Sequence, residues 1–271
     1  MKKPCLTVAL TVALTLVCAL LAPPVQAHNG TAGICLPVHG ITIDGDLSDW
    51  PDDLPRYPIR VQEGGMLTDP NDLEASFQMG FDLDENAIYI AIDVVQDEST
   101  VIDTSVAGRY DYQDGTDVRV NLGHAVGDST GVHHYGFWGT NLQAWKKGKL
   151  ADVTAAVSRR RRNGHQYEWR IDLTELSEGE FQLTNRSVIG LGVAVMDVDE
   201  DGIPSYVTWG PLKGGQAYDF NSDAIILSDP HQAGSLSGRV RWDEQSITGP
   251  STLAIESTQS QVLHIDLKTD D

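Results

Sequence analysis

The stretch from Ser76 to Ser99 constrains the fold of this chain more than any other. Large apolar side chains occupy alternate positions in two runs, Phe77, Met79 and Phe81 in the first and Ile88, Ile90, Ile92 and Val94 in the second. This period of two, rich in β-branched and aromatic residues, is typical of strands, and the polar cluster 84–86 between the runs favours a turn. The second run is also partly apolar on its other side, as in a strand covered on both faces. We therefore expect a β-hairpin at the centre of a larger β-structure.

Further strands are expected along the chain, separated by turn signals. The candidate segments are residues 41–43, 117–122, 133–140, 152–159, 166–173, 188–198 and 206–209. Asn163-Gly164 is a tight-turn signal and predicts a second hairpin, and 174–178 can form one short helical turn. About eight or nine strands without long helices predict an all-β, antiparallel β-sandwich of jelly-roll-like type over residues 40–228.

The two ends of the sequence differ from this central part. Residues 1–27 read as a signal peptide, because two lysines precede an apolar run that ends in a small-x-small cleavage site at Ala27. An uncleaved anchor is the alternative, although the run is short for a membrane span. Residues 28–39 read as a flexible segment, with Cys35 as a lone thiol, and 229–235 as a linker. Residues 236–271 read as part of a second β-domain.

The net charge narrows the possible partners. The chain has 39 acidic against 19 basic residues and a formal charge of −20. Such a surface repels nucleic acid and anionic lipid, and it suits a secreted or periplasmic protein that binds cations or neutral ligands.

Five motifs in order resemble those of family 9 carbohydrate-binding modules and the related DOMON domains. They are Ile43-Asp44-Gly45-Asp46-Leu47 with Asp49-Trp50, Phe81-Asp82 with Ile88-Tyr89-Ile90, Asp114 to Val118, Gly164 to Leu173, and Ile189 to Asp199 followed by Trp209-Gly210. Arg119 stands where an acid is usual. Residues from Ser237 onward weakly resemble the start of a carboxypeptidase-regulatory-like domain. The resemblance implies a β-sandwich that binds oligo- or polysaccharide without catalysis, within a modular exported protein. It leaves open a DOMON-type haem-binding electron-transfer domain and a structural or sensory module without a ligand.

Sugar binding requires aromatic faces for the apolar side of a pyranose and polar groups for its hydroxyls. The candidate ligand-binding residues are Trp209, Trp138, Trp145, Tyr112 and Arg119. Trp209 occupies the matched Trp-Gly position and is the first choice. Glycines flank Trp138, and Trp145 precedes two lysines, which suggests exposure. Core positions remain the alternative for Trp209 and Trp138, because tryptophan is usually buried.

Other chemistries have weaker signals. Asp197, Asp199 and Asp201 alternate before Gly202 and could converge on a calcium ion, although a solvated acidic turn is the alternative. No cofactor is required by any motif. For haem the available axial ligands are Met79, Met196, His133, His134 and His165. The sequence shows no nucleophile elbow, phosphate loop or metalloprotease motif, so we expect no enzyme activity.

Overall fold

The computed structural model describes residues 31–64, 73–96, 113–123, 131–160, 164–198, 204–210, 222–229, 234–236 and 263–265. The first strands are β1 (Ala32–Pro37), β2 (Tyr57–Ile59), β3 (Val61–Gly64), β4 (Glu74–Asp82), β5 (Ala87–Gln96), β6 (Gly115–Asn121) and β7 (His133–Trp138). They are followed by β8 (Asn141–Lys146), β9 (Val153–Arg160), β10 (Gly164–Asp172), β11 (Val188–Val198), β12 (Pro204–Thr208) and β13 (Ser222–Ile226). The helical turns in these ranges are η1 (Leu47–Asp49), η4 (Leu150–Asp152) and α2 (Leu173–Leu176). The expectation of an all-β chain is confirmed.

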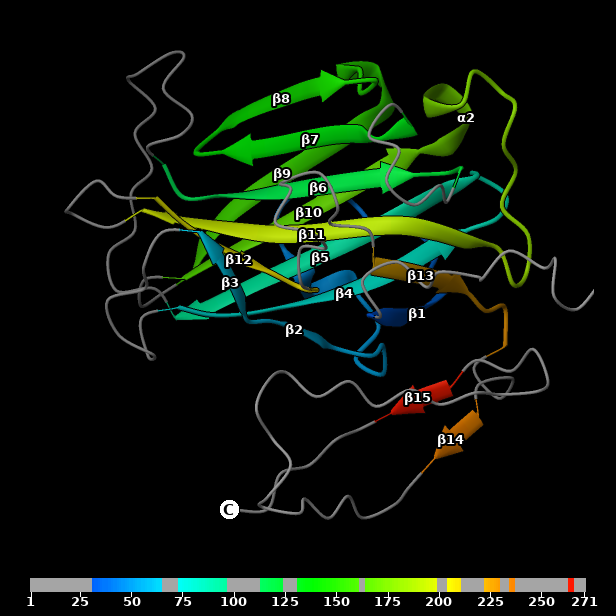
Figure 1. The fold of residues 1–271 in the computed structure, drawn as a ribbon, viewed down its shortest axis with the longest axis horizontal. Coiled ribbons are helices and arrows are strands. Elements are labelled where there is room, and N and C mark those ends of the chain that lie inside the picture. The colour runs from blue at the N-terminus through cyan, green and yellow to red at the C-terminus, as the bar shows by residue number, and fades with distance from the viewer. Residues whose placement is uncertain are drawn as a thin grey trace, which may run out of the picture.

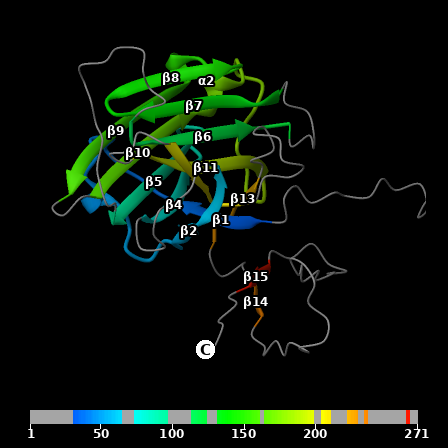
Figure 2. The same ribbon diagram turned by 60° about the vertical axis from the view of Figure 1, so that its left-hand side comes forward.

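These strands form one curved sheet, in the order β8-β7-β6-β11-β13-β1-β4-β5-β10-β9, with β2, β3 and β12 paired beside this path (Figure 1). The path is nearly closed, because η4 connects its two end strands, β8 and β9. Strands β6, β7, β8 and β11 make up one half, and β4, β5, β9 and β10 make up the other (Figure 2). The two halves enclose the core.

The expected hairpin of residues 76–99 is confirmed as β4 and β5. Its strands pair antiparallel from Ala75 opposite Val94 to Asp82 opposite Ala87, and Asn86 takes the turn with φ 48°. The inward side chains of both strands belong to the main core, where they meet Val118, Tyr135 and Ile189 of the other half. The second predicted hairpin is also confirmed, because β9 pairs antiparallel with β10; its turn lies outside the described residues.

The outer face of β5 and β10 is covered by the segment around residues 41–54. Trp50 and Leu54 pack on Tyr89 and Ala91 of β5 in a second core cluster. Glu168 of β10 is fully buried, and its carboxylate accepts hydrogen bonds from the amides of Asp44 and Gly45 at 2.9 and 2.6 Å and from Trp50 Nε1 at 2.7 Å. Both faces of the central strands are therefore buried, as the sequence pattern indicates.

The conformation of Gly45 explains the glycine of the Ile-Asp-Gly motif. Its φ is +89°, and an added Cβ would lie 2.7 Å from the backbone nitrogen of Ser158 in β9. The carbonyl of Gly45 also accepts a hydrogen bond from Ser158 Oγ at 2.6 Å. Only glycine combines this backbone conformation with such a close approach. The motif is thus a docking element of the fold.

The sequence predicts a flexible segment at residues 28–39. This prediction is wrong for residues 32–37, because they form strand β1. This strand lies between β13 and β4 and is parallel to both, so the sheet is not entirely antiparallel. Cys35 is buried within it with 1% exposure, and burial raises the pKa of its thiol well above the ordinary value. Strands β2, β3, β8 and β13 are also absent from the sequence-based prediction. The short helical turn is confirmed as α2, which Asp172 caps.

Both ends of the chain lie largely outside the described residues. The predicted signal peptide at 1–27 is not covered by the structure. In the predicted linker and second domain, β14 (Gly234–Leu236) pairs parallel with β15 (Leu263–Ile265) as a separate two-stranded sheet. In the described ranges, no helix has the length and apolar character needed to cross a membrane.

Candidate functional site

Three of the five predicted ligand residues lie together on the outer face of the sheet half that contains β6, β7 and β8. Register places Arg119 opposite His134, and His134 opposite Trp145. Asp117 and Trp138 lie on the same face. Asp117 is one row further along, and Trp138 is two rows further along. We call the set of Asp117, Arg119, His134, Trp138 and Trp145 the tryptophan face.

The two indoles of the tryptophan face converge over a glycine. The ring centroids of Trp138 and Trp145 are 4.9 Å apart, with an interplanar angle of 47°. A Cβ added to Gly136 would lie 3.0 Å from both rings, and one added to Gly115 would collide with the Trp138 indole. The two glycines therefore allow the indoles to lie against the sheet. Trp138 is buried beside Met196 and Val198, whereas Trp145 is half-buried and presents the accessible aromatic surface.

Polar groups beside the indoles are held in fixed positions. The Asp117 carboxylate receives Nε2–H of His134 at 2.7 Å on Oδ1 and Nη2–H of Arg119 at 3.1 Å on Oδ2. The His134 ring in turn packs on Trp145, with centroids 4.7 Å apart. Arg119 is 8% exposed, so only a small part of its side chain reaches the surface. The face thus combines an aromatic surface with polar side chains that are held in fixed positions.

The remaining sequence predictions fall elsewhere. Trp209, the first choice, is 7% exposed in the main core, where it contacts Phe77 edge-on at 5.0 Å and Tyr57 at 5.6 Å. Its faces are occupied by protein, so the expectation of a stacking surface there is corrected. Tyr112 lies outside the described residues.

The predicted calcium ligands are only partly covered by the structure. Asp197 is buried on β11, and Asp199 and Asp201 lie outside the described residues. Among the side chains that the structure describes, no group of three or more His, Cys, Asp or Glu could hold a metal ion. The acids of the Asp44–Asp49 segment instead accept local backbone hydrogen bonds. Met79 and Met196, considered for haem, are core residues.

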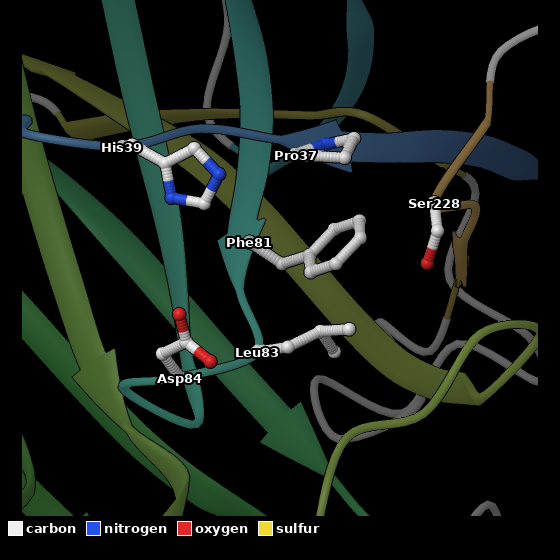
Figure 3. Close-up of a pocket in the computed structure, with 6 residues that line it drawn as sticks. All are labelled: Pro37, His39, Phe81, Leu83, Asp84 and Ser228. Atoms are coloured by element: carbon white, nitrogen blue, oxygen red, sulfur yellow. The ribbon is translucent and has the colours of Figure 1, made fainter.

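A cleft of about 250 Å³ lies where β1 and β4 end (Figure 3). It is lined by Pro37, His39, Phe81, Leu83, Asp84 and Ser228. His39 Nδ1–H donates to Asp82 Oδ2 at 2.7 Å. Burial raises the pKa of Asp82, but this bond and the amides of Glu85 and Asp84 together hold it below the ordinary value. Phe81 in this lining is 1% exposed, so its ring offers no open face to a ligand.

His133 is the first residue of β7. It lies on the face of the strand opposite to the tryptophan face. Its Nδ1 lies 4.0 Å from Asp152 Oδ2, an oxygen that already accepts Tyr135 Oη–H and the Lys149 amide at 2.8 Å each. Burial lowers the pKa of His133; the Asp152 charge opposes this, and the Lys147 and Lys149 charges add to it. The fold therefore favours a neutral imidazole here.

We predict that His133 makes the protein less stable in mild acid. Unfolded His133 binds a proton more readily than folded His133, so the free energy of unfolding should fall as pH drops from about 7 to about 5. Urea unfolding of the wild type and of His133→Gln across this range measures the effect. The variant should show a shallower loss, and equal slopes in both proteins would contradict the assignment.

Comparisons with known proteins give matches in structure only. No protein-family model matches the sequence. A search of curated proteins found no significant match. A family 9 carbohydrate-binding module from Caldicellulosiruptor kristjanssonii in complex with glucose is similar with a TM-score of 0.58 at 15% identity, over 73% of this chain and 96% of that one. This protein has the fold of family 9 carbohydrate-binding modules.

Two further structures agree with this fold. A family 9 module of the same organism in complex with cellotriose has a TM-score of 0.57 at 16% identity, over 77% of this chain and all of that one. A protein from Bacteroides uniformis, whose assignment as carbohydrate-binding is provisional, has a TM-score of 0.51 at 12% identity, over 73% of this chain and 99% of that one. The resemblance inferred from the five sequence motifs is confirmed at the level of the fold. The C-terminal carboxypeptidase-regulatory-like resemblance has no support from these comparisons.

Proposed function

We propose that this protein is a non-catalytic carbohydrate-binding module whose ligand site is the tryptophan face. The observation that carries the proposal is the convergence of Trp145 and Trp138 over Gly136, beside Arg119 and His134. An indole face matches the apolar C–H side of a pyranose, and guanidinium and imidazole groups match its hydroxyl rim. The shared fold supports the proposal, because solved family 9 modules are in complex with glucose and cellotriose.

A sugar site also needs polar side chains in fixed orientations, and the hydrogen bonds of Asp117 provide this for His134 and Arg119. With one carboxylate oxygen on His134 and the other on Arg119, both side chains are held in place before a ligand arrives. Preorganised side chains lose less conformational entropy on binding than mobile ones. The ring of Trp145 is supported in the same way by His134 on one side and Trp138 on the other.

We extend the proposal to the setting of the module. The N-terminal signal sequence would direct export, and the two halves of the sheet would form a jelly-roll-like sandwich within a larger modular protein. A structural calcium ion at Asp197, Asp199 and Asp201 remains a prediction, which thermal unfolding with and without a calcium chelator tests. An unchanged midpoint would remove it.

Isothermal titration with glucose and cellotriose tests the proposed function directly. We expect saturable binding of one ligand per chain, with dissociation constants in the roughly micromolar to millimolar range that a small interface of this kind allows. Absence of heat and of retardation in affinity electrophoresis, for a folded protein against a panel of neutral and anionic glycans, would overturn it.

A further inference from the structure

The cleft at the ends of β1 and β4 has a polar side that the proposed function does not use. Its lining combines three polar with three apolar side chains, namely His39, Asp84 and Ser228 with Pro37, Phe81 and Leu83. In Figure 3, His39 and Asp84 lie on one side of the cleft, and Ser228 lies on the other side. The tryptophan face contributes no residue to this lining, so the cleft is a separate candidate site.

Asp82 fixes the orientation of the His39 imidazole. The Asp82 carboxylate accepts three hydrogen bonds, from His39 Nδ1–H at 2.7 Å and from the amides of Asp84 and Glu85 at 2.8 and 3.1 Å. Three accepted hydrogen bonds favour the ionised form of a carboxyl group. Because the Nδ1 proton is committed to Asp82, the Nε2 atom of the neutral imidazole is a hydrogen-bond acceptor. The His39 side chain is 72% exposed, so a ligand in the cleft can reach this acceptor.

The other polar groups of the lining also favour a ligand that donates hydrogen bonds. Asp84 is exposed, and in the described ranges no hydrogen bond or ion pair engages its carboxylate, which accepts and cannot donate. The backbone amides of Asp84 and Ser228 are occupied by Asp82 and Asn185. Among the described residues that line the cleft, none is lysine or arginine. The side chains of the cleft therefore match a positively charged donor.

A primary ammonium group fits this lining better than a hydroxyl group or a metal ion. It has three donors and no acceptor, whereas a hydroxyl oxygen would bring further lone pairs toward the carboxylate. Within the described part of the chain, no group of three or more His, Cys, Asp or Glu could hold a metal ion. Leu83 is 37% exposed beside Pro37, and such apolar surface suits a hydrocarbon body. The formal charge of −20 also attracts small cations.

We propose that this cleft binds a small primary amine in its ammonium form. The ammonium donates to His39 Nε2 and to the Asp84 carboxylate, and the hydrocarbon part of the ligand lies on Leu83 and Pro37. Asp82 positions His39 and does not contact the ligand. This site is independent of the tryptophan face and adds a second ligand class to the proposed function.

Cyclohexylammonium and cyclohexanol are matched probes, because they share one ring and differ in the charge and the polar group. The ¹⁵N-labelled full chain is titrated at about pH 8, where free alkylamines are charged and free imidazoles are neutral. The amide signals of Leu83 and Asp84 should report a roughly millimolar dissociation constant for the amine and one at least about tenfold higher for cyclohexanol. Cyclohexanecarboxylate should leave these signals in place, and salt raised from roughly 0.02 to 0.5 M should weaken amine binding.

Variants of the lining locate the site. Asp84→Asn removes the charge and keeps the shape of the side chain, so it should weaken cyclohexylammonium binding about fivefold or more. Glu74→Gln is the matched control, because Glu74 is exposed at the other end of β4, roughly 25 Å along the strand. It should keep the affinity within about twofold. His39→Phe removes the Nε2 acceptor and should also weaken binding, and thermal unfolding confirms that each variant is folded.

Each outcome decides one part of the inference. Equal affinities for cyclohexanol and cyclohexylammonium overturn the ammonium class, and unchanged signals of Leu83 and Asp84 at high amine concentration overturn the site. Equal losses in Glu74→Gln and Asp84→Asn overturn the location. Trp145→Ala should keep the amine affinity of the wild type, and its loss there would place the amine on the tryptophan face instead. Failure of the carbohydrate proposal leaves these expectations unchanged.

Discussion

Glu168→Ala should lower the free energy of unfolding by about 3 kcal/mol or more, the largest stability effect that we expect from one polar substitution in this chain. The wild-type carboxylate is fully buried and accepts hydrogen bonds from Asp44, Gly45 and Trp50. Alanine leaves three donors without their acceptor, and two of them, the Gly45 amide and Trp50 Nε1, make buried hydrogen bonds. The cost of unsatisfied buried groups adds to the loss of the cover over β5.

Urea unfolding measures this loss, with Glu180→Ala as the matched control. Glu180 is exposed, and its removal should change the free energy of unfolding by less than about 0.5 kcal/mol. Glu168→Gln should fall between the two, because the amide retains one acceptor oxygen and presents its NH₂ group to the other donors. Equal stability of Glu168→Ala and the wild type would show that the segment around residues 41–54 is not held by this carboxylate.

Trp145→Ala should weaken the binding of cellotriose at least about tenfold, as expected for the loss of an aromatic anchor. The side chain is half-buried and packs against His134 on the proposed ligand surface. Its removal should affect stability less than removal of Trp138, whose indole packs on Met196 and Val198. Titration calorimetry compares the variant with the wild type at equal protein concentration.

Trp209→Phe is the control for this prediction. Phenylalanine retains a ring beside Phe77 and Tyr57, so the variant should lose some stability and keep its affinity for cellotriose within about twofold. If Trp209→Phe weakened binding and Trp145→Ala did not, the ligand site would have to be sought at the Trp-Gly position favoured by the sequence motif.

The sequence predicts most of the strands whose side chains alternate clearly. The hairpin β4–β5 has large apolar residues at every second position, and β9–β10 and β11 have comparable patterns. Strand β1 gives no such signal. It contains a glycine and a proline and lies between parallel neighbours, and a strand buried in this way has no polar face to produce alternation.

The sequence predicts three of the five residues of the tryptophan face, but it does not predict which tryptophan lies at the centre of the site. Trp138, Trp145 and Arg119 were all named from the sequence, and the structure places them on one face. Which tryptophan faces outward depends on register, since a shift of one residue reverses every side chain of a strand. Register arises from pairing between distant segments, so the sequence motif around Trp209 could not show that its ring lies in the core. His134 and Asp117 gain their roles only through the same pairing.

The tryptophan indole N–H signals of a ¹⁵N-labelled chain provide the most direct test of the central claim. The sequence contains six tryptophans, and assignment by single substitutions identifies each signal. On titration with cellotriose, we expect the signals of Trp145 and Trp138 to shift together with one affinity, while those of Trp50, Trp169 and Trp209 stay in place. Shifts confined to the last three signals, or no shift at saturating ligand, would contradict a carbohydrate site on the tryptophan face.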